Sequence, residues 1–220
     1  MFDLDGTLID SSLDLAHSVN AARASMGMGP ISHELVFSYV GNGAPVLMRK
    51  AMGPEASEQD VQRALDFFIR YYRQHCLDNT VLYPGVKEAL DRLHEGGVPM
   101  AVLTNKPVRI SNHIVGSLGL GRHFFRVYGG NSFEQKKPHP IGIETLLAES
   151  GLPRESAYMV GDSAVDVRTA RNAGIRACGV SYGFQPDSFA AEPPDLLIDR
   201  MAELADAVLK PGVRPTSGTR

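Results

Sequence analysis

Beyond Tyr83-Pro84-Gly85, short apolar runs alternate with segments of helical periodicity almost to the end of the chain. The run from Val98 to Leu103 has the continuous apolar character of a strand buried on both faces. Parallel strands need crossover connections, usually helices, so this alternation predicts an α/β fold with a doubly wound, mainly parallel sheet. Further strands are expected at residues 126–128, 157–160, 175–180 and 196–198.

Residues 11–80 differ, because they carry helical periodicity without a buried strand. Apolar positions recur at helical spacing from Ser11 to about Met28, and Ser57 with Asp60 resembles a capping box that opens another helix. We therefore predict a helical cap inserted after the first strand. The predicted division is residues 1–10 plus 81–209 for the core, 11–80 for the cap and 210–220 for a flexible tail.

Composition narrows the class of protein. The chain has 220 residues, 43% hydrophobic and 21% charged, which is ordinary globular usage. A net charge of -3 without a basic run disfavours nucleic acid as a partner, and no apolar run reaches the 18 or so residues of a membrane span. Cys76 and Cys178 form no paired motif, which fits a reducing compartment. With no signal peptide recognised, we expect a cytoplasmic protein.

Two carboxylates lie close to the start, in Asp3-Leu4-Asp5-Gly6-Thr7. Residues i and i+2 of an extended segment project to one side, so Asp3 and Asp5 can converge where the strand ends. Convergent carboxylates suit magnesium together with substrate phosphate oxygens. One aspartate could then attack phosphorus while the other moves protons. The alternative is an exposed acidic turn, which Asp and Gly favour for backbone reasons.

Other polar residues follow later strands, where ligands bind in such sheets. Thr104-Asn105 precedes a helix and suits a phosphate, or is an ordinary helix cap. Lys137 stands beside two prolines that could aim it inward, although most such lysines are solvated. Asp162 ends a strand, and Asp166 follows four residues on, where a first-turn charge is also favoured by the helix dipole.

Taken in order, these motifs resemble the haloacid dehalogenase superfamily of aspartate-nucleophile hydrolases, with a helical cap inserted after the first motif. Four further segments look like those of the bacterial phosphoglycolate phosphatases within it. They are Tyr39-Val40-Gly41-Asn42-Gly43, Leu103-Thr104-Asn105-Lys106-Pro107, Lys136-Lys137-Pro138-His139-Pro140 and Val180-Ser181-Tyr182-Gly183.

The resemblance implies an aspartyl-phosphate mechanism. Asp3 would attack the phosphoryl group, and Asp5 would protonate the leaving alkoxide and then activate water. Thr104 would hydrogen-bond a phosphoryl oxygen, and Lys137 would hold the nucleophile and neutralise charge. The implied cofactor is Mg²⁺, held by Asp3, the Asp5 carbonyl and Asp162, with Asp166 acting mostly through water.

The implied substrate is a small phosphorylated metabolite, 2-phosphoglycolate, which would yield glycolate and phosphate. Its carboxylate would need a cation or N–H donors from the cap. Our hypothesis is that the loop Gly41-Asn42-Gly43 and either Arg49 or Lys50 bind this carboxylate, beside Asn105. The alternative is that both cations are solvated on the surface of the cap. A monomer or a homodimer is expected.

Several alternatives share the core motifs. A pyrophosphatase, a sugar-phosphate phosphatase or a β-phosphoglucomutase-like enzyme would differ only in the cap. A phosphorylated signalling domain and a catalytically silent binding protein are disfavoured, the former because it lacks an inserted cap. Only Met1 and Phe2 precede Asp3, whereas a strand typically has about five residues. We expect from this an absent N-terminal extension and a weakly supported nucleophile.

Overall fold

The computed structural model describes residues 1–209 and contains one parallel sheet, so the predicted fold class is confirmed. The predicted tail, residues 210–220, lies outside the described residues. Neighbouring strands pair in the order β4-β3 on one side and β5-β6-β7 on the other. Their bounds are β3 Ala101–Leu103, β4 Arg126–Tyr128, β5 Tyr158–Gly161, β6 Arg176–Val180 and β7 Leu196–Ile198.

The amino-terminal residues join these two halves. Phe2 bridges in parallel to Val102 of β3 and to Val160 of β5. Its N–H donates to Ala101 O at 2.9 Å, and Asp3 N–H donates to Val160 O at 2.8 Å. The short extended segment at Phe2 therefore lies between β3 and β5 at the centre of the sheet, and Asp3 stands at the carboxyl edge of the sheet. The Met1 amino group donates to Tyr158 O at 2.8 Å, and burial lowers its pKa to about 5.

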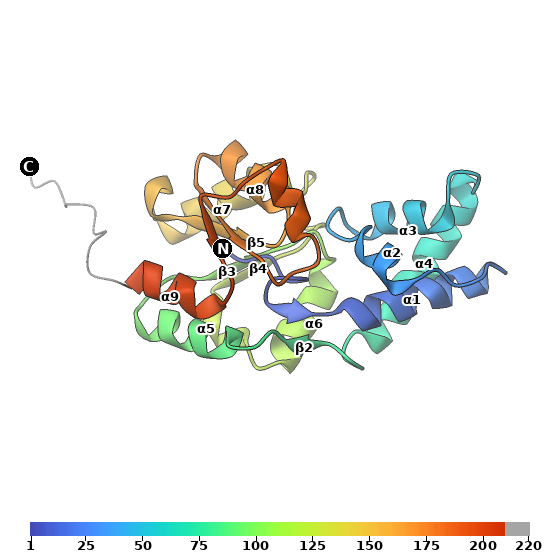
Figure 1. Cartoon of the computed structure of the whole chain (residues 1–220), viewed down its shortest axis with the longest axis horizontal. Coiled ribbons are helices and arrows are strands. Elements are labelled where there is room, and N and C mark those ends of the chain that lie inside the picture. Colours follow the sequence, from blue (N-terminus) through green and yellow to red (C-terminus); the bar gives the residue numbers. More distant parts are fainter. Residues whose placement is uncertain (210–220) are drawn as a thin grey trace, which may run out of the picture.

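Helices cover both faces of the sheet (Figure 1). Because side chains alternate across a strand, Ala101 and Leu103 pack with Ile143 and Leu146 on one face, whereas Val102 belongs to the apolar cluster of the other. The core helices are α5 Val86–Glu95, α6 Val108–Ser117, α7 Ile141–Ser150, α8 Ala164–Ala173 and α9 Met201–Leu209.

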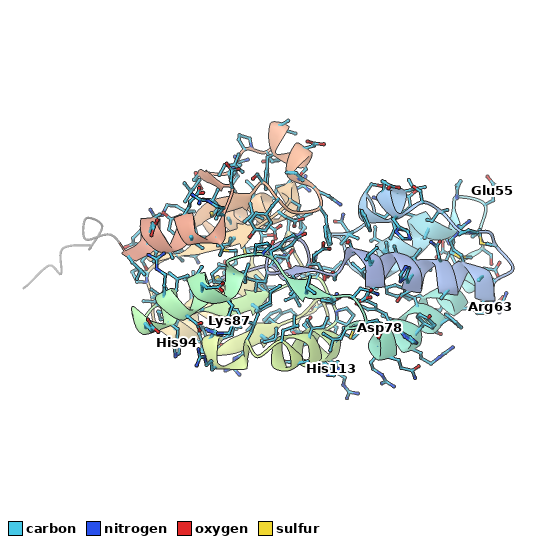
Figure 2. The ribbon with its side chains drawn as sticks, turned by 60° about the horizontal axis from the view of Figure 1, so that its bottom comes forward. Glu55, Arg63, Asp78, Lys87, His94 and His113 are labelled. Atoms are coloured by element: carbon cyan, nitrogen blue, oxygen red, sulfur yellow. The ribbon has the colours of Figure 1, made fainter. Side chains whose placement is uncertain are left out.

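The helices between residues 12 and 75 form a second body at one end of the core (Figure 1). Leu15, Val19, Ala64 and Phe68 are buried within it. Figure 2 shows Glu55 and Arg63 at the end of this body that lies farthest from the core. Its helices are α1 Ser12–Ser25, α2 His33–Phe37, α3 Ala44–Met52 and α4 Glu58–His75.

The chain leaves and re-enters the core through a pair of short antiparallel strands that the sequence did not predict. These are β1 Ile9–Asp10 and β2 Val81–Leu82, with Ile9 opposite Leu82. Buried Asp14 fixes the return, because its carboxylate accepts from Thr80 N at 2.9 Å and from Thr80 Oγ1 at 2.7 Å. The two chain segments that connect the core to the second body are thus hydrogen-bonded to each other.

Some predicted boundaries were wrong by a few residues. The strand expected from Val98 begins at Ala101, because Val98 N–H bonds Leu93 O at the end of α5 and Pro99 has no N–H to offer. Pro107 is the N-cap residue of α6, which begins at Val108. Within residues 1–209, none of the helices is long and apolar enough to cross a membrane.

Candidate active site

Asp3 is a buried carboxylate that follows the Phe2 bridges, at the carboxyl edge of the parallel sheet. Its Oδ1 accepts from Leu4 N–H at 2.8 Å and lies 3.0 Å from Lys137 Nζ. Burial raises the pKa of Asp3 to about 6, although Lys137 and the Thr104 hydroxyl oppose that rise. Ionising Asp3 is therefore costly without further positive charge.

Three buried carboxylates meet at this edge. Asp3, Asp162 and Asp166 each present an oxygen within 4.8 Å of the others. Burial raises the pKa of Asp162 well above its ordinary value, and the charges of Asp166 and Asp3 raise it further. Mutually repelling oxygen ligands of this kind fit a hard divalent cation, which would relieve the repulsion.

Backbone geometry holds Asp162 in place. Its Oδ2 accepts from Phe184 N–H at 2.7 Å. Gly6 packs directly on this carboxylate: a Cβ at Gly6 would lie 2.2 Å from Oδ2, and its φ of +76° already favours glycine. Gly183 also approaches this side chain closely, since a Cβ there would lie 2.2 Å from the Asp162 Cβ and 2.4 Å from Gly6 O. Neither glycine was assigned a role from the sequence, although Gly6 lies in the first motif.

Asp166 has both carboxylate oxygens engaged. Oδ1 accepts from Lys137 Nζ at 2.6 Å, and Oδ2 accepts from Ser163 Oγ at 2.8 Å in a capping box at the start of α8. Burial lowers the pKa of Lys137, but Asp166 and Asp3 outweigh it and raise that pKa to about 12. Lys137 therefore remains a cation beside Asp3.

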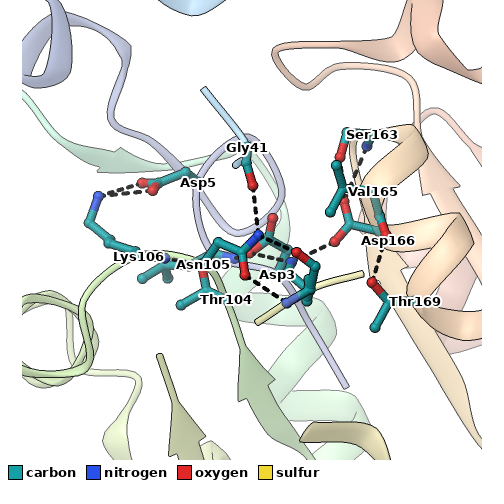
Figure 3. A network of polar contacts seen from close by, with 12 residues as sticks. Asp3, Asp5, Gly41, Thr104, Asn105, Lys106, Ser163, Val165, Asp166 and Thr169 are labelled. Atoms are coloured by element: carbon teal, nitrogen blue, oxygen red, sulfur yellow. Dashed lines mark hydrogen bonds and ion pairs between the residues drawn. The ribbon is translucent and has the colours of Figure 1, made fainter. Parts of the chain in front are cut away.

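Asn105 connects the loop before Lys137 to the cap. Its Nδ2 donates to Gly41 O at 2.9 Å and to Lys137 O at 3.0 Å, and its Oδ1 accepts from Lys137 N–H at 2.9 Å. Figure 3 shows the contact with Gly41. The amide is thus bound to backbone groups on two loops, and Asn105 positions both of them. Lys136 adds a second link, from Nζ to Asn42 O at 2.7 Å.

Asp5 faces a different cation from Asp3. Lys106 Nζ lies 2.7 Å from its Oδ1 and 3.0 Å from its Oδ2, and Ser11 Oγ donates to Oδ1 at 2.6 Å. Lys106 also bonds the Tyr72 hydroxyl at 2.5 Å (Figure 3 shows its contacts with Asp5). No role for Lys106 was predicted from the sequence, although it lies in a motif two residues after Thr104.

A cavity of about 50 Å³ lies at this site, between the core and the cap. Its floor includes Asp3, Asp5, Asp162 and Thr104. Leu15, Val40, Leu47 and Phe68 give it apolar cap walls, joined by Gly41, Gly43, Ala44 and Tyr72.

The structure does not bring every predicted substrate residue to this cavity. Gly41, Gly43 and Asn105 line it, whereas Asn42 does not. Arg49 points elsewhere, with one guanidinium nitrogen 2.8 Å from Ala56 O and another 3.3 Å from Glu58. Lys50 is exposed and lies over the Tyr39 ring. Neither cap cation lines the cavity.

Formal charges of the site support the fit to a divalent cation. Asp3, Asp5, Asp162 and Asp166 carry four negative charges when ionised, and Lys137 and Lys106 return two positive ones. One divalent cation would supply the remaining two.

Comparison with known proteins places these features in a family. The model of the haloacid dehalogenase-like hydrolase family matches residues 1–180. A phosphoglycolate phosphatase of Pseudomonas fluorescens strain Pf0-1 is 42% identical over 216 residues, which are 95% of this chain and 79% of that protein. One from Vibrio vulnificus strain CMCP6 is 38% identical and covers 94% of each chain.

Solved structures of other proteins have a similar fold. A predicted phosphoglycolate phosphatase from Haemophilus somnus has a TM-score of 0.88 at 34% identity, covering 94% of this chain and 95% of its own. A predicted phosphatase from Clostridium acetobutylicum has a TM-score of 0.83 at 22% identity, with 94% of this chain and 96% of its own covered. The second likeness concerns the fold alone.

Proposed function

Because the chain belongs to the haloacid dehalogenase-like hydrolase family, we propose that it is a magnesium-dependent phosphomonoesterase that hydrolyses 2-phosphoglycolate to glycolate and phosphate. The observation that carries the proposal is the placement of Asp3. It is a buried carboxylate within an acidic triad, paired with Lys137 and lying on the floor of a cavity under the cap. Such a site combines a nucleophile with the charge needed to receive a phosphate ester.

The first step joins Asp3 to phosphorus. A carboxylate oxygen of Asp3 forms the new bond, the ester oxygen leaves, and Asp5 gives that oxygen a proton. Lys137 remains charged at 3.0 Å from Asp3 and offsets charge that gathers on the phosphoryl oxygens. Thr104, buried beside Asp3, is the expected hydroxyl donor to one of those oxygens.

The second step releases the phosphate. Asp5, now ionised, takes a proton from water, the water oxygen bonds phosphorus, and the bond to Asp3 breaks. Ser11 and Lys106 hold the Asp5 carboxylate in position through this exchange. Apolar cap residues line the cavity beside these groups, and any bulk water they displace during the reaction would strengthen the electrostatic contacts inside it.

Magnesium would be held by Asp3 and Asp162, with the Asp5 carbonyl as a further ligand. When bound, it would polarise the phosphoryl group and balance its charge. Asp166 is expected to act differently, because Lys137 and Ser163 already engage both of its oxygens. Its role would be to orient Lys137 and to support the other two carboxylates.

The choice of substrate rests on two observations. The cavity is small, and the relatives that are 37–42% identical over most of the chain carry the name phosphoglycolate phosphatase. The cytoplasmic location and the monomeric or dimeric state stay predictions.

Steady-state kinetics test the proposal. We would measure kcat/KM with Mg²⁺ for 2-phosphoglycolate, pyrophosphate, β-glucose 1-phosphate and p-nitrophenyl phosphate, and repeat the series with EDTA. We expect the highest value for 2-phosphoglycolate and no turnover with EDTA. A higher value for pyrophosphate or the sugar phosphate would contradict the substrate assignment, and full activity in EDTA would contradict the metal.

A further inference from the structure

Lys106 is a buried cation inside the cavity. Its side chain is 3% exposed, and it is the only Lys, Arg or His among the described residues that line the enclosure. Lys137 lies nearby but bonds Asp3 and Asp166 instead. The two lysines therefore serve different parts of the site, one beside the nucleophile and the other beside Asp5.

The partners of Lys106 come from both bodies of the protein. The ammonium contacts both oxygens of Asp5 in the core and the hydroxyl of Tyr72 on cap helix α4. It also lies 4.5 Å from the centre of the Tyr72 ring, within the range of a cation–π contact. Lys106 thus stands where the cap meets the acid–base residue.

The geometry of the reaction fixes where a substrate carboxylate must lie. In the proposed mechanism, phosphorus is at Asp3 and the leaving ester oxygen is at Asp5. In 2-phosphoglycolate a single methylene separates that oxygen from the carboxylate, so the carboxylate must stay close to Asp5. The Lys106 ammonium, 2.7 Å from Asp5, is within reach of this position.

Other cations of this region are committed elsewhere. Arg49 bonds Ala56 O and Glu58, Lys50 is exposed over Tyr39, and Lys136 donates to Asn42 O. None of the three lines the cavity. The carboxylate would therefore need a cation that the cap helix α3 does not supply.

We propose that Lys106 is the specificity-determining residue that binds the carboxylate of the substrate. The inference rests on the proposed function and deepens it. The substrate carboxylate takes a hydrogen bond from the Lys106 ammonium, while the hydroxyl and ring of Tyr72 hold that ammonium from the cap side. An ester without this carboxylate gains nothing from Lys106, so the enzyme selects small phosphate esters that carry a second anion one carbon away.

Ethyl phosphate provides the matched substrate, because a methyl group replaces the carboxylate of 2-phosphoglycolate. The quantity to measure is the ratio of kcat/KM for 2-phosphoglycolate to kcat/KM for ethyl phosphate. For Lys106→Met we expect this ratio to fall by about 10- to 100-fold, as for the loss of a charged hydrogen bond. Lys106→Arg, which keeps the charge, should retain most of the preference.

Lys50→Met is the control, since it removes an exposed lysine that does not line the cavity, and its ratio should match that of the wild type. If the methionine variant fails to fold, Lys106→Gln, which keeps a donor for Asp5, provides the same comparison. Equal losses on both esters in a folded Lys106 variant would overturn the assignment and leave Lys106 as a positioning residue for Asp5.

The two proposals fail in different ways. A wild type that turns over ethyl phosphate as well as 2-phosphoglycolate would contradict the proposed substrate, and this inference with it. A wild type that selects 2-phosphoglycolate, together with a Lys106→Met enzyme that selects it equally, would overturn the Lys106 assignment alone.

Discussion

The Lys137 ammonium lies 2.6 Å from Oδ1 of Asp166, and both side chains are 2% exposed. A buried pair of this kind leaves an uncompensated charge when one member is removed. The same ammonium also contacts Asp3, so this pair connects the folding of the core to the placement of the nucleophile.

Lys137→Met should lower both activity and stability. We expect kcat to fall by about 10²- to 10³-fold through the loss of a charged donor, and the free energy of unfolding to fall by about 3–5 kcal/mol. Urea unfolding and steady-state kinetics measure the two effects. Lys87→Met is the control, because Lys87 is 49% exposed in its pair with Asp91 and such a pair contributes about 0–1 kcal/mol. Equal destabilisation by both changes would contradict the account.

The stabilisation of the protein by Mg²⁺ should increase with pH. In the folded metal-free protein the pKa of Asp3 is about 6, above its ordinary value of 3.8. The folded state therefore binds a proton that the unfolded chain has lost, and the stability contributed by this group declines as pH rises through that window. Mg²⁺ competes with the proton, so its affinity should fall about tenfold for each pH unit below that pKa.

Thermal unfolding with and without Mg²⁺ between about pH 5 and pH 8 measures this dependence. The shift in Tm should be small at the acidic end and increase across this range as Asp3 and Asp162, whose pKa values are both raised, lose their protons. A shift that is independent of pH would show that binding displaces no proton from the buried carboxylates, in conflict with the proposed ligand set.

Gly6→Ala should weaken metal binding. The new Cβ would lie 2.2 Å from Oδ2 of Asp162, so that carboxylate must move. Gly27→Ala is the matched control: its φ of +72° gives comparable backbone strain, of about 1–2 kcal/mol, but nothing lies within 4 Å of its Cβ. We expect calorimetry to show a Mg²⁺ affinity at least about tenfold weaker for Gly6→Ala alone. Similar affinities in the two variants would contradict the packing argument.

Asn105→Ala should impair catalysis more than stability, because the amide positions both the Lys137 loop and the cap loop at Gly41. A loss in kcat/KM of about 10- to 100-fold is expected from this loosening. Asn131→Ala provides the comparison: its Oδ1 accepts a single hydrogen bond, from Val108 N–H, and it is exposed. The account would be contradicted if Asn131→Ala reduced kcat/KM as much as Asn105→Ala.

Much of the core site could be predicted because it follows from strand order. Asp3, Thr104 and Asp162 end neighbouring parallel segments, and the carboxyl ends of such segments meet at one edge. Lys137 was placed by its family motif, since no periodicity indicates which way a loop lysine points. The short strands β1 and β2 left no pattern, because two residues are too few to alternate.

The cap was harder to read from the sequence. Arg49 and Lys50 were expected near the substrate, yet the buried positions of α3 are Ala44, Leu47, Met48, Ala51 and Met52. That spacing turns the two cations away from the buried face. Lys106 was missed because its partners are distant in sequence: Asp5 is 101 residues away and Tyr72 is 34. Only tertiary contact reveals such a pairing.

The nucleophilic role of Asp3 is the central claim, and trapping the phosphorylated enzyme tests it most directly. Rapid acid quenching during turnover of 2-phosphoglycolate, followed by peptide mass spectrometry, should find a phosphoryl group on Asp3. Asp3→Asn should carry none and should be inactive. A phosphoryl group on another residue, or turnover by Asp3→Asn at the wild-type rate, would contradict the account.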